Sequence, residues 1–212
     1  MYIKIGFIIL QTLNIGCTVF GVRTVEEPGY KVIIQDANKE IRQYDPSIVA
    51  KTKVKGEYKE AQNEGFRILA SYIFGKNKRN KDIAMTAPVT QESASESIAM
   101  TAPVTQAKQN ENWIMSFTMP SKFSSVKDLP TPIDDRIILS QIPGGTYAAI
   151  SYTWLASLEK NKQMAKALMH WLKENPEYEV VSEPFYAGYN PPWTLPFLRH
   201  NEMIVEIKKK NT

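Results

Sequence analysis

The sequence predicts an α+β fold, in which two helices pack on a distorted, largely antiparallel sheet or open barrel of about eight strands. Segments in which apolar residues alternate with polar ones are typical of strands, and they surround two segments with apolar residues at helical spacing. The order strand, turn, strand, helix, strand, connection, strand occurs twice, so we expect pseudo-twofold symmetry. Tight turns cannot join parallel neighbours, and the hairpin expected before each helix therefore favours antiparallel pairing.

The first helix is predicted over residues 58–74, with Gly75 as its C-cap. A stripe of Phe66, Ala70 and Ile73 makes its apolar surface wider than one sheet contact needs. The residues expected to face the sheet are Ala61, Gly65, Ile68, Leu69 and Tyr72. The second helix is expected over 157–174, and the strands over 30–35, 40–44, 48–54, 113–119, 136–142, 147–152, 178–182 and 203–207.

The nonapeptide IAMTAPVTQ occurs twice, at Ile83–Gln91 and Ile98–Gln106. Its alternating pattern predicts a strand in each copy, with the polar residues 92–97 as a loop. Pro88 cannot donate a ladder hydrogen bond, so that strand is expected at a sheet edge or with a bend. A tandem duplication that lengthens a loop explains the identity of the copies better than a functional need for both.

The composition excludes some classes of function. A formal net charge of +4 with scattered basic residues does not predict a nucleic-acid-binding face. The one cysteine excludes an intrachain disulfide and a cysteine-rich metal site. We also expect no enzyme, because the sequence has no nucleophile motif, no cluster of His, Cys and carboxylates, and no phosphate-binding glycine loop.

The first residues have the layout of a signal peptide. Lys4 precedes the largely apolar run Ile5–Ile15, and the Gly16-Cys17 junction is similar to a bacterial lipoprotein cleavage site. We therefore expect residues 1–16 to be removed and residues 17–212 to form one exported domain, attached to the membrane only through a lipid on Cys17. The alternative is a cytoplasmic protein in which this run is an ordinary strand or helix and Cys17 is a buried thiol.

Six short segments, each weak alone, are specific together: Val19–Thr24 (VFGVRT), Glu40–Tyr44 (EIRQY), Gly65–Leu69 (GFRIL), Ile83–Val89 (IAMTAPV), Gly188–Trp193 (GYNPPW) and Arg199–Glu202 (RHNE). On these segments the chain resembles the SOUL haem-binding protein family from Val19 to Lys208. The resemblance implies a distorted barrel with two helices and pseudo-twofold symmetry, in agreement with the predicted order of elements. The junction at Cys17 also resembles that of exported bacterial members.

The resemblance implies that haem or another tetrapyrrole binds in a shallow apolar groove, and another flat amphiphile is the alternative ligand. The residues expected to contact this cofactor are Phe66, Ala70, Ile73, Met85, Lys76 and His200. Family positions on the first helix match Phe66 and Ala70, but an apolar stripe of this kind suits ordinary core packing equally well. Lys76 is expected near the propionates, and the alternative is that it belongs to a solvated basic loop.

No residue is a strong candidate for an axial iron ligand. Gln43 stands where some relatives have a histidine, and an amide does not replace it. His200, close to an aromatic stretch, is a better candidate than His170, although a surface position is expected for both. Tyr44 is a third option. Burial of about 400 Å² of ring would contribute roughly 10 kcal/mol before association costs, which predicts micromolar, exchangeable binding suited to carriage or buffering.

Two other functions stay open at the level of sequence. Glu202 could act as a general base in the hydrolysis of a small amphiphile, but a strand cap or a pair with Arg199 is the more ordinary interpretation. The aromatic segment 185–197 could bind a protein partner, with Tyr189 and Trp193 as anchors.

Overall fold

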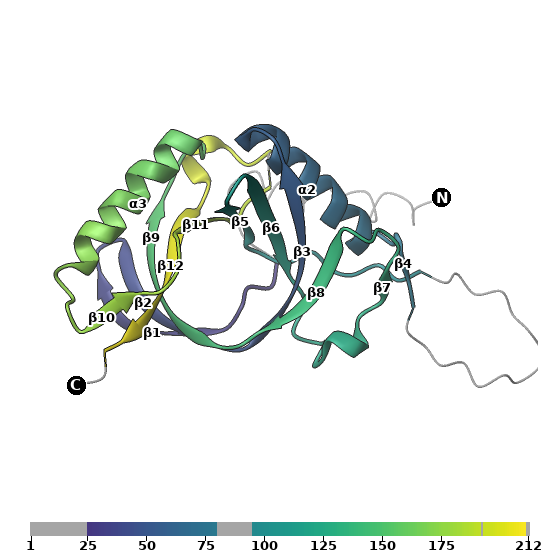
Figure 1. Cartoon of the computed structure of the whole chain (residues 1–212), viewed down its shortest axis with the longest axis horizontal. Coiled ribbons are helices and arrows are strands. Elements are labelled where there is room, and N and C mark those ends of the chain that lie inside the picture. The colour runs from purple at the N-terminus through teal and green to yellow at the C-terminus, as the bar shows by residue number, and fades with distance from the viewer. Residues whose placement is uncertain (1–24, 80–94, 192, 211–212) are drawn as a thin grey trace, which may run out of the picture. The chain divides into compact units, whose positions relative to one another are not determined.

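The computed structural model describes residues 25–79, 95–191 and 193–210 (Figure 1). They form two compact units, each drawn from separate stretches of the chain. The α2 unit comprises residues 26–29 and 44–145, and the α3 unit comprises the other described residues. The predicted leader, Cys17 and the first copy of the repeat lie outside the described residues. Within these ranges, no helix has both the length and the apolar character needed to cross a membrane.

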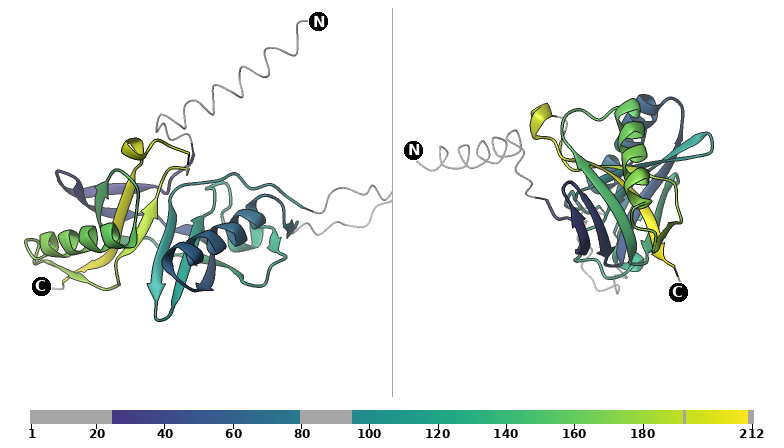
Figure 2. Two further views of the ribbon diagram at one scale, coloured as in Figure 1. Left: turned by 90° about the horizontal axis from the view of Figure 1, so that it is seen from above. Right: turned by 90° about the vertical axis from the view of Figure 1, so that its left-hand side faces the viewer.

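The α2 unit is an antiparallel sheet covered by one helix. The strand order is β5 (Val104–Gln109), β6 (Asn112–Thr118), β3 (Ser47–Lys55) and β8 (Ile137–Ile142). Helix α2 (Tyr58–Ile73) lies against β3 and β6 (Figure 2). The short strands β4 (Asn77–Lys78) and β7 (Thr131–Pro132) pair with each other, and a 3-10 turn, η1 (Val126–Asp128), precedes β7.

Helix α2 begins and ends where the sequence predicts. Gly75 has φ +106°, a left-handed conformation that favours glycine and follows the helix C-cap Phe74. The face predicted to pack on the sheet is buried, with Leu69 and Tyr72 fully enclosed. The Tyr72 hydroxyl also donates to the carbonyl of Pro130 at 2.8 Å, so its polar atom is satisfied inside the core.

The α3 unit follows the same plan. Its strand order is β1 (Tyr30–Asp36), β2 (Lys39–Tyr44), β9 (Gly145–Tyr152), β12 (Asn201–Lys209) and β11 (Phe185–Gly188), and β10 (Tyr178–Val180) also pairs with β12. Helix α3 (Leu158–Leu172) starts at Ser157, whose hydroxyl caps it by accepting from the Lys160 N–H. The turn η2 (Pro196–Leu198) precedes β12. Leu168, Trp171 and Leu172 pack against residues of β9 and β12.

The α+β class, the antiparallel pairing and both helices are confirmed, whereas two local predictions are wrong. Strands β8 and β9 do not form a hairpin, because β8 pairs with β3 and β9 pairs with β12. The second repeat copy is a strand only from Val104 onward. The preceding Pro103 has no N–H to donate to a ladder, so the pairing begins after it.

The connection between β8 and β9 passes very close to the connection between β2 and β3. A Cβ atom on Gly144 would lie 2.6 Å from the carbonyl oxygen of Tyr44 and 3.2 Å from the Pro46 ring. A side chain at this position therefore meets backbone that cannot easily move.

We predict that Gly144→Ala lowers the free energy of unfolding by about 1–3 kcal/mol, because it forces the two connections apart. Urea denaturation of the purified protein measures this change. Gly145→Ala is the matched control for the loss of glycine flexibility. Equal stability of the Gly144 and Gly145 variants would contradict the close approach.

Candidate functional site

Helix α2 and its C-cap carry an apolar stripe at intervals of four residues, in which Phe66 and Phe74 are exposed and Ala70 between them is buried. The side chains of Phe66 and Phe74 are 38% and 66% exposed, although the Phe66 ring also contacts the Phe117 ring edge at 5.5 Å. Ile73 is 1% exposed and belongs to the core. We call Phe66, Ala70 and Phe74 the α2 stripe. Ile73, which the sequence predicted in this stripe, packs in the core instead, and Phe74 is the exposed residue at this end of the helix.

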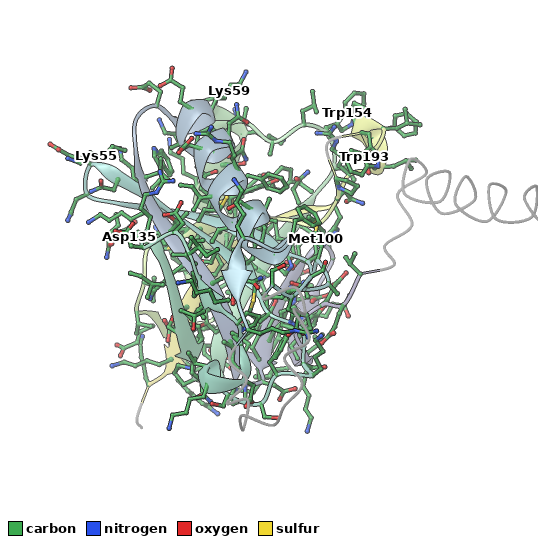
Figure 3. The ribbon with its side chains drawn as sticks, turned by 90° about the vertical axis from the view of Figure 1, so that its right-hand side faces the viewer. Lys55, Lys59, Met100, Asp135, Trp154 and Trp193 are labelled. Atoms are coloured by element: carbon green, nitrogen blue, oxygen red, sulfur yellow. The ribbon has the colours of Figure 1, made fainter. Side chains whose placement is uncertain are left out.

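A hollow of about 760 Å³ adjoins the last turns of α2. Figure 3 shows this side of the molecule, with Lys59 at the first turn of α2 and Asp135 on the loop before β8. The hollow is lined by Arg67, Ile68, Ser71, Lys76, Ile133, Asp134, Asp135 and Arg136. It is therefore open to small polar or charged groups.

Two of the cations in this hollow are already paired with carboxylates. Arg67 bonds to Glu64, and Arg136 bonds to Asp134 at 2.6 Å and to Glu64 at 3.2 Å. The hydrogen bond from Arg136 lowers the pKa of Asp134, which keeps this carboxylate charged. Lys76, in contrast, forms no ion pair with any described residue. Its charge acts on Asp134 and helps to lower the pKa of that carboxyl, so Lys76 is the least tightly held of the three cations in the hollow rather than a fully unengaged one.

Other residues singled out in the sequence are spread through both units. Met85 lies outside the described residues, but its equivalent in the second repeat copy, Met100, is half-buried against the α2-unit core. The Gln43 side chain is exposed and accepts from the Thr146 hydroxyl at 2.9 Å. His170 is exposed on α3, as predicted.

His200 lies in the α3 unit beside a buried charged cluster centred on Glu202. This carboxylate is 1% exposed and accepts from both terminal nitrogens of Arg42, at 2.9 and 2.7 Å. It also accepts from the Tyr189 hydroxyl at 2.6 Å, and His200 Nε2 lies 3.0 Å away. The Nε atom of Arg42 donates to Glu40 at 2.6 Å. The single guanidinium of Arg42 therefore binds two carboxylates inside the unit.

The cluster holds Glu202 strongly ionised. Burial acts to raise its pKa, but hydrogen bonds from His200, Arg42 and Tyr189 and the charge of Arg42 outweigh burial and lower the pKa to about 2. The predicted pair with Arg199 is wrong, because the arginine bound to Glu202 is Arg42, and Arg199 Nε donates to the Thr194 carbonyl. A carboxylate with this pKa is a weak base at neutral pH.

The sequence did not reveal this cluster as a unit, because 160 positions separate Arg42 from Glu202. A signal was nevertheless present. Arg42 belongs to the segment EIRQY, Tyr189 to GYNPPW, and His200 and Glu202 to RHNE. Three of the segments that carried the family resemblance therefore converge on one set of hydrogen bonds.

Two loops of the α3 unit present exposed aromatic rings. Trp154 and Trp193, both labelled in Figure 3, are each 61% exposed. The Trp154 ring is 6.5 Å from the Phe197 ring. Tyr189, expected as an anchor for a protein partner, is instead buried and bound to Glu202.

The residues that the structure describes contain no group of three or more His, Cys, Asp or Glu side chains arranged to hold a metal ion. The ring nitrogen Nε2 of His200 is engaged with Glu202, so only Nδ1 of that ring is open to a further partner.

The fold and these sites define an α+β protein that presents an apolar helix stripe beside an available cation. A family model described as SOUL heme-binding protein matches residues 25–206, and the chain belongs to this family. It is 30% identical over 197 residues to Heme-binding protein 2 of Homo sapiens, covering 90% of each chain. It is 29% identical to Heme-binding protein 2 of Mus musculus, covering 85% of each chain. These relatives support haem binding at the level of the family.

Solved structures share the fold at low sequence identity. The crystal structure of the EcmrR C-terminal domain superposes with a TM-score of 0.55 at 12% identity, covering 85% of this chain and 99% of that one. An uncharacterized conserved protein from Listeria innocua gives a TM-score of 0.50 at 12% identity, covering 81% of this chain and 92% of the other. Similarity at this level concerns the fold alone.

We predict that, because of the Glu202 cluster, the free energy of unfolding decreases at acidic pH. The pKa of Glu202 is lowered on folding from its ordinary value of 4.5 to about 2, so its stabilisation is complete above about pH 4.5 and is lost as pH falls through about 2. The total is on the order of 3 kcal/mol, of which about 2 kcal/mol is lost by pH 3.

Urea unfolding at pH 7 and pH 3 measures this loss, and carbon NMR of the Glu202 carboxyl measures its titration directly. For Glu202→Gln, the free energy of unfolding is expected to fall between pH 7 and pH 3 by about 2 kcal/mol less than for the unchanged protein, since glutamine cannot titrate. An unchanged difference, or a carboxyl that titrates near pH 4.5, would refute the assignment.

Proposed function

We propose that this protein binds haem or a related tetrapyrrole on the α2 stripe and carries or buffers it without transforming it. The observation on which the proposal rests is that Phe66 and Phe74 stay exposed on a helix whose other apolar residues are buried, in a member of the SOUL haem-binding family. Exposed apolar surface of this kind usually marks a binding site.

The residues present fit the organic part of such a ligand. Two aromatic side chains spaced two helical turns apart can contact a flat ring, and Ala70 between them leaves room for it to approach. Lys76, just beyond the helix and without an ion-pair partner among the described residues, can attract a propionate. When bound, haem supplies the iron and the apolar ring, and these side chains supply contact area and charge.

The α2 unit does not supply a histidine for the iron, because the two histidines of the chain, His170 and His200, belong to the α3 unit. Affinity at the α2 stripe then comes from ring burial and from Lys76. Such binding is expected near the micromolar range, with rapid exchange, which suits carriage or buffering.

Catalysis is disfavoured by the state of Glu202. A general base works best with a pKa near the working pH, whereas the pKa of Glu202 is about 2 and both of its oxygens are bound by Arg42. The Glu202 cluster is better explained as a structural element of the α3 unit.

Titration with haemin, followed by Soret absorbance, tests the proposal. We predict that Phe66→Asp and Phe74→Asp each weaken binding at least tenfold, because a carboxylate removes apolar contact and repels the propionates. Ile138→Asp is the matched control, since Ile138 is an exposed apolar residue on β8 of the same unit. Equal affinity of all three variants and the unchanged protein would reject the α2 stripe as the site.

The iron contributes little if no axial ligand is fixed. Metal-free protoporphyrin IX, followed by its fluorescence, is therefore expected to bind within a few-fold of haemin. A loss of affinity of a hundredfold or more on removal of the iron would instead require a protein ligand, and His200→Ala and Tyr44→Phe would then identify it.

We also propose that the protein is exported and carries a lipid on Cys17. This part of the proposal rests on the sequence pattern of residues 1–20 alone. Mass spectrometry of the protein from its native membranes tests them. We expect a mature chain that begins with diacylated Cys17, and a Cys17→Ser variant that is not retained by the membrane.

A further inference from the structure

A second groove, which we call the α3 groove, follows the outer side of helix α3. It has a volume of about 530 Å³ and lies between the helix and the residues before β11. Its lining residues are Lys162, Ala165, Lys166, Met169, His170, Lys173, Glu183 and Pro184. Because Lys162 and Lys173 are eleven residues apart on one helix, the groove is about 16 Å long at about 1.5 Å per residue.

The α3 groove combines an apolar floor with a basic rim. Ala165, Met169 and Pro184 are half-buried and form the floor. The rim carries the exposed side chains of three lysines and His170, against the single carboxylate of Glu183. None of the three lysines forms an ion pair with a described residue. The groove is therefore both apolar and unbalanced in charge.

The spacing of these cations is unfavourable without an anion. Lys162, Lys166 and His170 follow one another at intervals of four, which places neighbouring basic groups side by side on the helix. Opposite charges at this spacing stabilise a helix, and like charges such as Lys162 and Lys166 destabilise it. The hollow beside α2 shows the ordinary arrangement, since Arg67 and Arg136 are paired with carboxylates.

We propose that the α3 groove binds a linear amphiphile with a single anionic headgroup, either a long-chain carboxylate or a long-chain phosphate monoester. An apolar floor that runs along one helix accommodates an alkyl chain better than a flat ring. The headgroup lies among Lys162, Lys166 and His170, where it removes the repulsion between the two lysines and can accept a hydrogen bond from the imidazole. This site is independent of the tetrapyrrole proposed for the α2 stripe.

Calorimetric titration of the full chain with laurate and with dodecyl phosphate, both below their critical micelle concentrations, tests the proposal. We expect saturable binding of one equivalent of at least one of the two, and their relative affinities distinguish a carboxylate ligand from a phosphate ligand. Lys166→Glu and Met169→Asp are each expected to weaken it at least tenfold. Lys59→Glu, on the exposed first turn of α2, is the matched control and should bind like the unchanged protein.

Lys166→Glu is expected to fold, because a glutamate four residues after Lys162 replaces a repulsive neighbour with an attractive one. Its melting temperature, expected to equal or exceed that of the unchanged protein, checks this point. The proposal fails if neither anionic probe binds saturably, if Lys166→Glu and Lys59→Glu bind equally well, or if the cationic dodecyltrimethylammonium binds as tightly as laurate.

Discussion

The architecture of the α2 unit depends on how closely helix α2 approaches its sheet. A Cβ atom on Gly65 would lie only 3.1 Å from Cβ of Met115, so glycine lets the helix settle onto β6. The face of the helix that packs on the sheet also includes Leu69, which is completely buried. Phe66 and Phe74 lie away from this face and stay exposed. The exposed positions of the stripe thus follow from which face of the helix packs on the sheet.

The α3 unit is organised around a different constraint, the burial of charge. Arg42 on β2 and Glu202 on β12 are almost inaccessible to water, and each needs the other because an unpaired charge in that place would cost several kcal/mol. Tyr189 and His200 are held in place by the same carboxylate. The groups of this cluster are already engaged with one another, which leaves ligand binding to surfaces such as the α2 stripe and the α3 groove.

The sequence predicts the helices and strands of this fold better than it predicts which strands pair with each other. Both helices follow from apolar residues at helical spacing, which is a local property. The pairing of β8 with β3 is a long-range contact that no local pattern records, and the hairpin inferred from residues 143–145 was therefore wrong. The α2 stripe was predicted in part: Phe66 and Ala70 follow from spacing and family resemblance. The sequence did not show that Ile73 is buried and Phe74 exposed, because this depends on which face of the helix packs on the sheet.

Contact between a tetrapyrrole and the outward side of α2 is tested most directly by backbone NMR. Gallium protoporphyrin IX, a diamagnetic substitute for haemin, would be titrated into isotopically labelled protein. We predict that the largest amide shift changes occur at Phe66, Ala70, Phe74 and Lys76, while the amide shifts around Glu202 change little. Saturable binding that leaves these α2 resonances unchanged and shifts another element instead would contradict it.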